Sequence, residues 1–287
     1  MIVVTGATGK FGSIVIEDLL ARGVPAGEIV AAVRSPEKAA GFAERGVQVR
    51  RADYTEPESL VAAFAGADKV LFVSGSEPGH RADGHRNVVA AARTAGVGQI
   101  VYTSLLNLET GQLTLADDHK MTEALILESG IPFVFLRNGF YFDLYSDNIG
   151  PALEHGALVD ASSDGRLSLS TRVEFANAAA AVLATEGHDN KVYELGGDHS
   201  FSLPELAEEV SRQTGRTIAY RNLTPGEYTE MLVGFGLPRP LAEIYADTRV
   251  GTERGDLFTT SDDLSRLLGR PTTTLADAVA AKLKELG

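Results

Sequence analysis

Three glycines separated by two residues each stand near the start of the chain, in the stretch VVTGATGKFG. Gly6 follows a short apolar run at residues 2–5, and Gly12 opens an amphipathic stretch at 11–22. Glycines at such positions permit a tight turn, and the helix that follows offers free N–H groups to an anion. The stretch predicts a strand–turn–helix unit that binds a diphosphate, and a tight turn without a ligand is the alternative.

The first half of the chain alternates short β-branched runs with longer amphipathic stretches. Pro36 and Pro57 suit the first turns of two helices. This alternation is typical of an α/β protein with a doubly wound, Rossmann-type parallel sheet that is covered by helices on both faces. The expected strands are residues 2–5, 28–34, 47–51, 69–74, 99–103 and 133–137, the expected helices are 11–22, 36–45, 58–64, 85–95 and 115–129, and the helix ends are expected at Gly46, Gly66, Gly96 and Gly130.

After residue 138 the alternation stops. An alanine-rich helix, RVEFANAAAAVLAT, and a short strand, KVYEL, are expected to return to the sheet. From about Phe201 the sequence predicts mostly helix, beginning with SLPELAEEVSRQTG, which is capped by Ser202 and ended by Gly215. We therefore expect a nucleotide-binding domain at 1–138 with a returning segment at about 157–198, and a smaller, mostly helical substrate domain at 139–156 and 199–287.

Composition excludes several classes of protein. The 287 residues are 44% hydrophobic and 23% charged, which is typical of a globular chain with a large core. The net charge of −13 argues against a nucleic-acid partner, which needs a basic face. Cysteine is absent and the histidines are scattered, so we expect neither disulfides nor a metal site. The sequence shows neither a membrane-spanning apolar run nor a signal peptide, and we expect a soluble cytoplasmic protein.

The residue that follows the second expected strand selects the type of dinucleotide. In NAD sites an acidic residue about 20 positions after the glycines accepts hydrogen bonds from the ribose 2′-hydroxyl. Here the strand ends in Val33 and Arg34, and an arginine binds a 2′-phosphate through charge-assisted hydrogen bonds. The position favours NADP(H), with Lys10 as a second positive charge. An ordinary solvated arginine at a strand end is the alternative.

Further loops are expected at the carboxyl ends of the strands, where doubly wound sheets bind their ligands. The first, with Asp53 and Tyr54, would face the adenine, although for Asp53 a role as a helix cap or loop acid is equally open. The second loop, at 74–76, would face the middle of the cofactor. The third, at 138–141, would face the nicotinamide.

Stretches from the whole chain resemble the NmrA-like branch of the atypical short-chain dehydrogenases. They include AAVRSPEKA, GHRNVVAAARTAGVGQIVYTSLL, LRNGFY and KVYELGGD, besides the glycine loop. Within that branch the chain is most similar to bacterial type-2 NAD(P)H:quinone oxidoreductases, and triphenylmethane-dye reductases share the pattern. The resemblance implies NADPH as the cofactor. It implies contacts with NADPH at Gly6, Ala7, Thr8, Gly9, Lys10, Phe11, Arg34, Ser74, Gly75, Ser76, Asn138, Gly139, Phe140, Tyr141, Phe142 and Asp143, with Arg172 directed toward the cofactor or the pocket.

The expected helix at 115–129 departs from ordinary short-chain reductases, which carry a Tyr-x-x-x-Lys pair there. This chain has His119 and Glu123, which share one face of the helix. Tyr102 lies too early, inside the preceding strand. We interpret His119 and Glu123 as a solvated pair beside other charged residues rather than as an acid–base couple, and we keep His119 as a candidate catalytic residue.

The missing pair restricts the hydride acceptor rather than abolishing the reaction. Hydride added to a ketone gives an alkoxide, whose conjugate acid has a pKa near that of water, about 15.7, so a proton must arrive in the transition state. Hydride added to a quinone gives a phenolate-like anion whose conjugate acid has a pKa of about 10, a difference worth roughly 8 kcal/mol. The sequence therefore predicts an NADPH-dependent quinone reductase, and a dye reductase or a non-catalytic NADP(H)-sensing regulator is the alternative.

Two residues are candidates for polar contacts to the acceptor oxygens. These are Asn138 and Tyr141, and for Tyr141 a role as a packed aromatic is the alternative. The pocket wall is expected from the C-terminal helices in YTEMLVGFGLPRPLAEIY. The apolar residues of this stretch would lie either against a flat ring or in the core, and they are Met231, Phe235, Leu237 and Tyr245.

Overall fold

The computed structural model describes residues 1–75 and 81–287 and divides the chain into two compact units. The first unit comprises Met1–Leu105, Asp118–Asn138 and Val173–Tyr193, and the second comprises Leu106–Asp117, Gly139–Arg172 and Glu194–Gly287. The segment that returns to the first unit is thus shorter than expected. The roles that we predict for the two units, nucleotide binding and substrate binding, stay predictions.

A doubly wound sheet forms the centre of the first unit, as predicted. Its strand order is β3-β2-β1-β4-β5-β6-β8, and the pairs from β3 to β6 are parallel. The order reverses between β1 and β4, and this switch point is where such sheets bind ligands. The strands are β1 (Ile2–Thr5), β2 (Ile29–Val33), β3 (Gln48–Arg51), β4 (Lys69–Phe72), β5 (Gln99–Leu105), β6 (Phe133–Asn138) and β8 (Lys191–Leu195).

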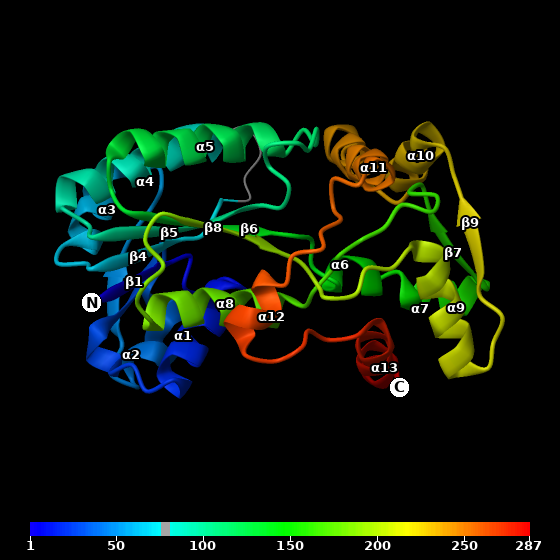
Figure 1. Cartoon of the computed structure of the whole chain (residues 1–287), viewed down its shortest axis with the longest axis horizontal. Helices are drawn as coiled ribbons and strands as arrows, with labels where there is room; N and C mark the ends of the chain where they lie inside the picture. Colours follow the sequence, from blue (N-terminus) through cyan, green and yellow to red (C-terminus); the bar gives the residue numbers. More distant parts are fainter. Residues whose placement is uncertain (76–80) are drawn as a thin grey trace. The chain divides into compact units, whose positions relative to one another are not determined.

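Helices cover both faces of this sheet (Figure 1). One face carries α3 (Pro57–Phe64), α4 (Arg81–Ala95) and α5 (Ala116–Ser129), and the other carries α1 (Gly12–Ala21), α2 (Ala40–Ala43) and α8 (Arg172–Ala184). Pro36 and Pro57 lie in first turns, as predicted. The glycines predicted at helix ends adopt left-handed φ angles between 68° and 88°, and they are Gly46, Gly66, Gly96 and Gly130.

Large aromatic side chains fill the layer between the sheet and α3, α4 and α5. Phe72, Tyr102 and Phe135 come from neighbouring strands, and each is at most 2% exposed. They belong to one core cluster with Leu60 and Phe64 of α3. Because burial of one large apolar side chain contributes roughly 1.5–3 kcal/mol, this cluster stabilises the strands whose ends carry the predicted binding loops.

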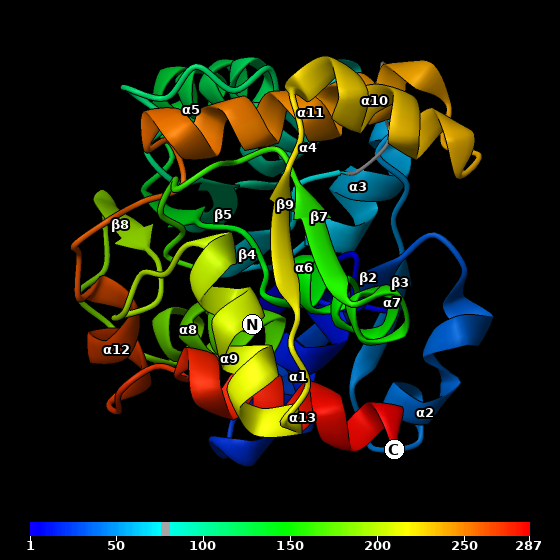
Figure 2. The same ribbon diagram turned by 90° about the vertical axis from the view of Figure 1, so that its right-hand side faces the viewer.

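The second unit contains a small sheet that the sequence did not predict. Strands β7 (Ala157–Asp160) and β9 (Ala219–Asn222) pair in parallel and lie side by side (Figure 2). Each strand has only 4 residues, and β9 is mostly exposed, so neither produces a recognisable apolar alternation. The segment after Phe201 is mostly helical, as predicted, and β9 is the strand within it that the sequence did not indicate.

Helices make up most of the rest of the second unit. Helix α9 (Leu203–Thr214) begins with the capping box of Ser202 and Glu205 and ends at Gly215, as predicted. The other helices are α6 (Asp143–Ser146), α7 (Ile149–His155), α10 (Pro225–Gly234), α11 (Arg239–Arg254), α12 (Asp263–Leu268) and α13 (Leu275–Leu286).

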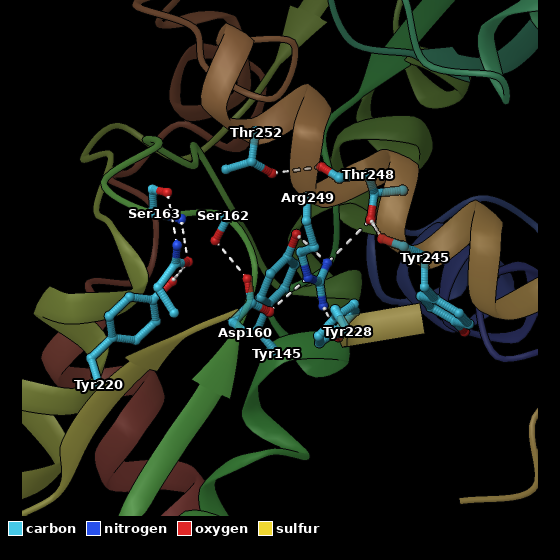
Figure 3. A network of polar contacts seen from close by, with 11 residues as sticks. Tyr145, Asp160, Ser162, Ser163, Tyr220, Tyr228, Tyr245, Thr248, Arg249 and Thr252 are labelled. Atoms are coloured by element: carbon cyan, nitrogen blue, oxygen red, sulfur yellow. Dashed lines mark hydrogen bonds and ion pairs between the residues drawn. The ribbon is translucent and has the colours of Figure 1, made fainter. Parts of the chain in front are cut away.

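A buried ion pair joins several elements of the second unit (Figure 3). Arg249 of α11 donates from Nε to Asp160 at the end of β7 over 2.6 Å, and the two side chains are 6% and 0% exposed. The terminal nitrogens of Arg249 donate to the hydroxyl groups of Tyr145 on α6 (3.2 Å) and Tyr228 on α10 (3.0 Å). The second carboxylate oxygen of Asp160 accepts a hydrogen bond of 2.6 Å from Ser162. Because an unpaired buried charge is costly, this cluster fixes the arrangement of α6, α10, α11 and β7.

Removal of the arginine tests this role. Arg249→Met should lower the free energy of unfolding by about 3–5 kcal/mol, because Asp160 would remain as a buried charge without its partner. The double variant Asp160→Leu/Arg249→Met should recover most of that loss, since apolar replacements of a buried pair are often tolerated. Unfolding in urea, followed by circular dichroism, measures both changes.

The matched control is Arg239→Met, which breaks the exposed pair between Arg239 and Glu230 and should leave stability unchanged. Equal losses in the single and double variants of the buried pair would show that packing, and not charge pairing, holds the cluster together.

Candidate functional site

The glycine loop joins β1 to α1. Where the start of α1 approaches the turn at Gly6, there is no room for a side chain. Gly6 adopts a φ of +60°, and the N–H of Gly9 donates to the Gly6 carbonyl over 2.8 Å. A Cβ atom on Gly12 would lie 2.5 Å from the Gly6 carbonyl oxygen, which is too close for any side chain. The helix therefore starts in direct contact with the turn. Ala7 is buried, whereas Gly6, Thr8, Gly9 and Lys10 are exposed.

The first turn of α1 offers backbone donors to an anion. Phe11 occupies the N-cap position, and among the described residues no side chain caps the helix and no acidic residue lies in its first turn. The N–H groups at a helix start lack partners within the helix and carry the positive end of its dipole. With Gly9 and Lys10 exposed beside it, this turn suits a phosphate group.

Side-chain hydrogen bonds connect the ends of β1 and β4 at the switch point. The Tyr54 hydroxyl lies 2.6 Å from Thr5 Oγ1 and donates to the Val73 carbonyl over 2.7 Å. Thr5 Oγ1 in turn accepts the N–H of Val73 over 3.0 Å. Burial raises the pKa of Tyr54, so its hydroxyl stays neutral. Tyr54, predicted beside the adenine, thus ties the ends of β1 and β4 together.

Asp53 and Arg34 lie at the ends of neighbouring strands. A hydrogen bond of 2.9 Å from the N–H of Thr55 is the largest cause that lowers the pKa of Asp53, and the nearby charge of Arg34 adds to it. The Thr55 hydroxyl donates to the same carboxylate oxygen over 2.8 Å. Asp53 therefore stabilises its own turn, which favours the loop-acid role that the sequence left open. Its contact with adenine stays a prediction. Arg34 is exposed directly after β2, where a 2′-phosphate is expected.

Ser74 and Gly75, in the loop after β4, are partly exposed. Ser74 donates its N–H to Thr103 Oγ1 over 2.8 Å. Ser76, the third predicted contact of this loop, lies outside the described residues.

Asn138 carries an unusual buried acceptor at the end of β6. The residue is 5% exposed, and its Oδ1 finds no hydrogen-bond partner within the described part of the chain. A buried polar atom without a partner costs about 1–3 kcal/mol. Such an atom calls for a ligand or another donor to satisfy it.

The other residues predicted around the nicotinamide belong to the second unit. The Arg172 guanidinium lies 4.7 Å over the centre of the Tyr141 ring, and one of its nitrogens is 3.7 Å from the Asp143 carboxylate. Burial raises the pKa of Tyr141, against the opposing charge of Arg172, so the phenol stays neutral. Its role as a donor to the acceptor oxygens stays a prediction. Gly139 and Phe142 are buried, and Phe140 is partly exposed.

The prediction that His119 and Glu123 form a solvated pair is wrong, because they are only 7% and 6% exposed. His119 Nδ1 lies 2.8 Å from the Tyr102 hydroxyl. Glu123 accepts the Ser104 hydroxyl over 2.5 Å and pairs with Arg137 over 2.8 Å. Two residues of a strand span about 6.6 Å and four residues of a helix about 6 Å. This face of α5 therefore lies in register over β5.

Burial changes what His119 can contribute chemically. Desolvation lowers the pKa of His119 to about 3, and the charge of Arg81 adds to this effect. At neutral pH the imidazole is therefore uncharged and holds no proton ready for transfer. Its catalytic role stays a prediction, and its position shows a packing contact with Tyr102.

Two of the four apolar residues predicted for the pocket wall lie at the edge of a core cluster. Met231 and Tyr245 pack against a group that contains Tyr228. Phe235, by contrast, is 76% exposed, and Leu237 is partly exposed. Contact of these side chains with a flat ring stays a prediction.

The described residues show neither a metal site nor a membrane-spanning helix. Across 1–75 and 81–287 no group of acidic residues and histidines is arranged to hold a metal ion. In the same ranges no helix has the length and apolar character needed to cross a membrane.

Comparison with known protein families accounts for the glycine loop and the sheet that carries it. Residues 6–186, more than half of the chain, match the family model described as NAD(P)H-binding. The chain belongs to the NAD(P)H-binding family. The family membership agrees with the anion site predicted at the start of α1.

Individual relatives match almost the whole chain. Quinone oxidoreductase 2 of Escherichia coli (strain K12) is 47% identical over 280 residues, with 98% of each chain covered. A solved structure of NADPH-dependent quinone oxidoreductase from Escherichia coli, complexed with NADPH, matches with a TM-score of 0.96 and 46% identity over 99% of this chain and 100% of that one.

Two more distant relatives extend the comparison. Triphenylmethane reductase of Citrobacter sp., complexed with NADP(H), matches with a TM-score of 0.94 and 42% identity over 98% of this chain and 100% of that one. An NmrA-like family domain-containing oxidoreductase of Aspergillus flavus is 29% identical over 294 residues, covering 98% of this chain and 94% of its own. The resemblance to the NmrA-like branch is thereby confirmed.

Proposed function

We propose that the protein is an NADPH-dependent oxidoreductase that transfers hydride to quinones and yields hydroquinones. The observation that carries this proposal is the glycine turn at the switch point, in a chain that matches a quinone oxidoreductase along almost its full length. We also propose that it acts in the cytoplasm, where NADPH is regenerated.

Residues of the first unit fit the parts of NADPH. The uncapped start of α1, in contact with the turn through Gly12, suits the diphosphate. Arg34 suits the 2′-phosphate, and the unpartnered Oδ1 of Asn138 suits the carboxamide N–H of the nicotinamide. Bound NADPH supplies the hydride, and these residues hold and orient it. The contacts implied for 139–143 and Arg172 stay predictions.

The environment of α5 supports a quinone rather than a ketone as the acceptor. Where ordinary short-chain reductases carry their tyrosine and lysine, this chain has a neutral, buried His119 and a Glu123 held by Arg137. Neither provides a proton of suitable acidity to an alkoxide. A hydroquinone anion needs no such donor, because its conjugate acid has a pKa of about 10. A cationic dye is a second candidate acceptor, favoured by the similarity to triphenylmethane reductase.

A panel of acceptors tests the reaction. Purified protein is mixed with NADPH and, in separate assays, with a benzoquinone, a cationic triphenylmethane dye or a simple ketone, while NADPH absorbance is followed. We expect turnover with the quinone and the dye and at least about 10²-fold less with the ketone, since the site offers no proton donor to the alkoxide that a ketone would give. Tight NADPH binding without turnover of any acceptor would contradict the proposal and favour a sensor.

Replacement of Arg34 tests the cofactor preference. Arg34→Ala should lower kcat/KM for NADPH by a factor equivalent to about 1.5–3 kcal/mol, the value of a hydrogen bond to a charged group. Activity with NADH should hardly change, because NADH has no 2′-phosphate. Steady-state kinetics with both cofactors measures the difference.

The control is Arg51→Ala at the end of the neighbouring strand β3, where Arg51 pairs with Glu56. This variant should affect neither cofactor. A loss for Arg34→Ala that is the same with NADPH and NADH would show that Arg34 does not bind the phosphate.

A further inference from the structure

Side chains hold residues 73–75, the first residues after β4. Its consecutive backbone N–H groups each donate to a side chain from a different element. The acceptors are Thr5 of β1 for Val73 (3.0 Å), Thr103 of β5 for Ser74 (2.8 Å) and His85 of α4 for Gly75 (3.0 Å). These three side chains therefore help to fix residues 73–75.

His85 is fully buried and uses both ring nitrogens. Because Nε2 accepts the N–H of Gly75, the ring proton lies on Nδ1, which is 2.7 Å from Thr122 Oγ1. The Thr122 hydroxyl donates onward to the Asp118 carbonyl over 2.7 Å. Burial lowers the pKa of His85 to about 3, with the charge of Arg81 adding to the effect. The neutral form that can accept from Gly75 is therefore the form present at neutral pH.

Arg81 holds Gly75 from its other side. Its Nε donates to the Gly75 carbonyl over 2.6 Å, and a terminal nitrogen lies 3.7 Å from the Asp118 carboxylate. The side chain of Arg81 is only 14% exposed. Gly75 is thus held through both its N–H and its carbonyl by α4, and both contacts continue to Asp118 and Thr122 of α5.

The held loop lies directly beside the glycine turn. A Cβ atom on Gly6 would be 3.8 Å from the Cβ of Val73, so the loops after β1 and β4 are in contact at the switch point. A shift of Gly75 would therefore change the surface next to the phosphate-binding turn.

We propose that His85 is a positioning residue for NADPH, which fixes Gly75 and thereby places Ser74 against the cofactor. The proposal rests on the NADPH site proposed above. It also gives α5 a function in this chain: the helix that carries the catalytic pair in ordinary short-chain reductases here supports the cofactor loop through Asp118 and Thr122.

Two substitutions of His85 distinguish a role in positioning Gly75 from a role in general packing of the core. In His85→Gln, the side-chain amide reaches the place of Nε2 and can still accept from Gly75. In His85→Asn, the shorter amide reaches only the place of Nδ1, so it keeps the contact with Thr122 and loses Gly75. NADPH affinity is measured by fluorescence titration without any acceptor. We expect the Kd to rise about three- to tenfold in His85→Asn, the value of one hydrogen bond, and to stay within about twofold in His85→Gln.

Hydrogen exchange of the Gly75 amide gives a second readout, in protein without NADPH. This amide should exchange faster in His85→Asn than in the wild type and should stay protected in His85→Gln. Equal Kd values in the two variants, or an unchanged Gly75 amide in His85→Asn, would overturn the proposal. Absence of quinone turnover would refute the proposed reaction, yet it would leave both of these comparisons interpretable.

Discussion

The contact between Gly12 and the carbonyl of Gly6 determines how the first unit can bind a nucleotide. A Cβ atom at position 12 would lie 2.5 Å from that oxygen, so only glycine lets α1 begin in contact with the turn that follows β1. The first turn of α1 then follows β1 at the place where the strand order reverses, between β1 and β4. Strands β2, β4 and β6 all end at the same edge of the sheet, because parallel strands share their direction. The loops that follow them therefore begin at that edge. This arrangement supports the proposal that Arg34, Ser74 and Asn138 contact the same ligand.

The proposed choice of hydride acceptor follows from the absence of a Tyr-x-x-x-Lys pair on α5. His119 contacts Tyr102 and Glu123 pairs with Arg137 within the first unit, so neither replaces the tyrosine and lysine of ordinary short-chain reductases. In the proposed function the chain accelerates hydride transfer by binding and orienting the two reactants, and the product anion needs no buried proton donor. This restricts the acceptor to molecules whose reduced form is a weak base, such as quinones. The same helix contacts Arg81 and His85 through Asp118 and Thr122, which is the basis of its proposed role in holding the loop after β4.

Much of the fold could be predicted from local sequence signals. The strands from β1 to β6, the capping box at Ser202 and the glycines at helix ends each depend on a few neighbouring residues. Strand β9 was missed because its 4 residues, AYRN, show no apolar alternation. The burial of His119 was missed because it depends on how α5 lies over β5, which is a tertiary property. His85 was missed for a related reason: a lone histidine in a helix gives no sign that it accepts from a loop ten residues earlier.

The affinity of Gly12→Ala for NADPH tests the central claim most directly. The comparison is Gly41→Ala in α2, where an added Cβ would meet nothing within 4 Å, and circular dichroism first shows which variants are folded at the titration temperature. If α1 binds the diphosphate through its close approach to Gly6, the folded Gly12→Ala protein should bind NADPH at least about tenfold more weakly, since relief of such a clash costs typically 1–3 kcal/mol. Gly41→Ala should bind it like the wild type. A folded Gly12→Ala protein with unchanged affinity for NADPH would contradict the account.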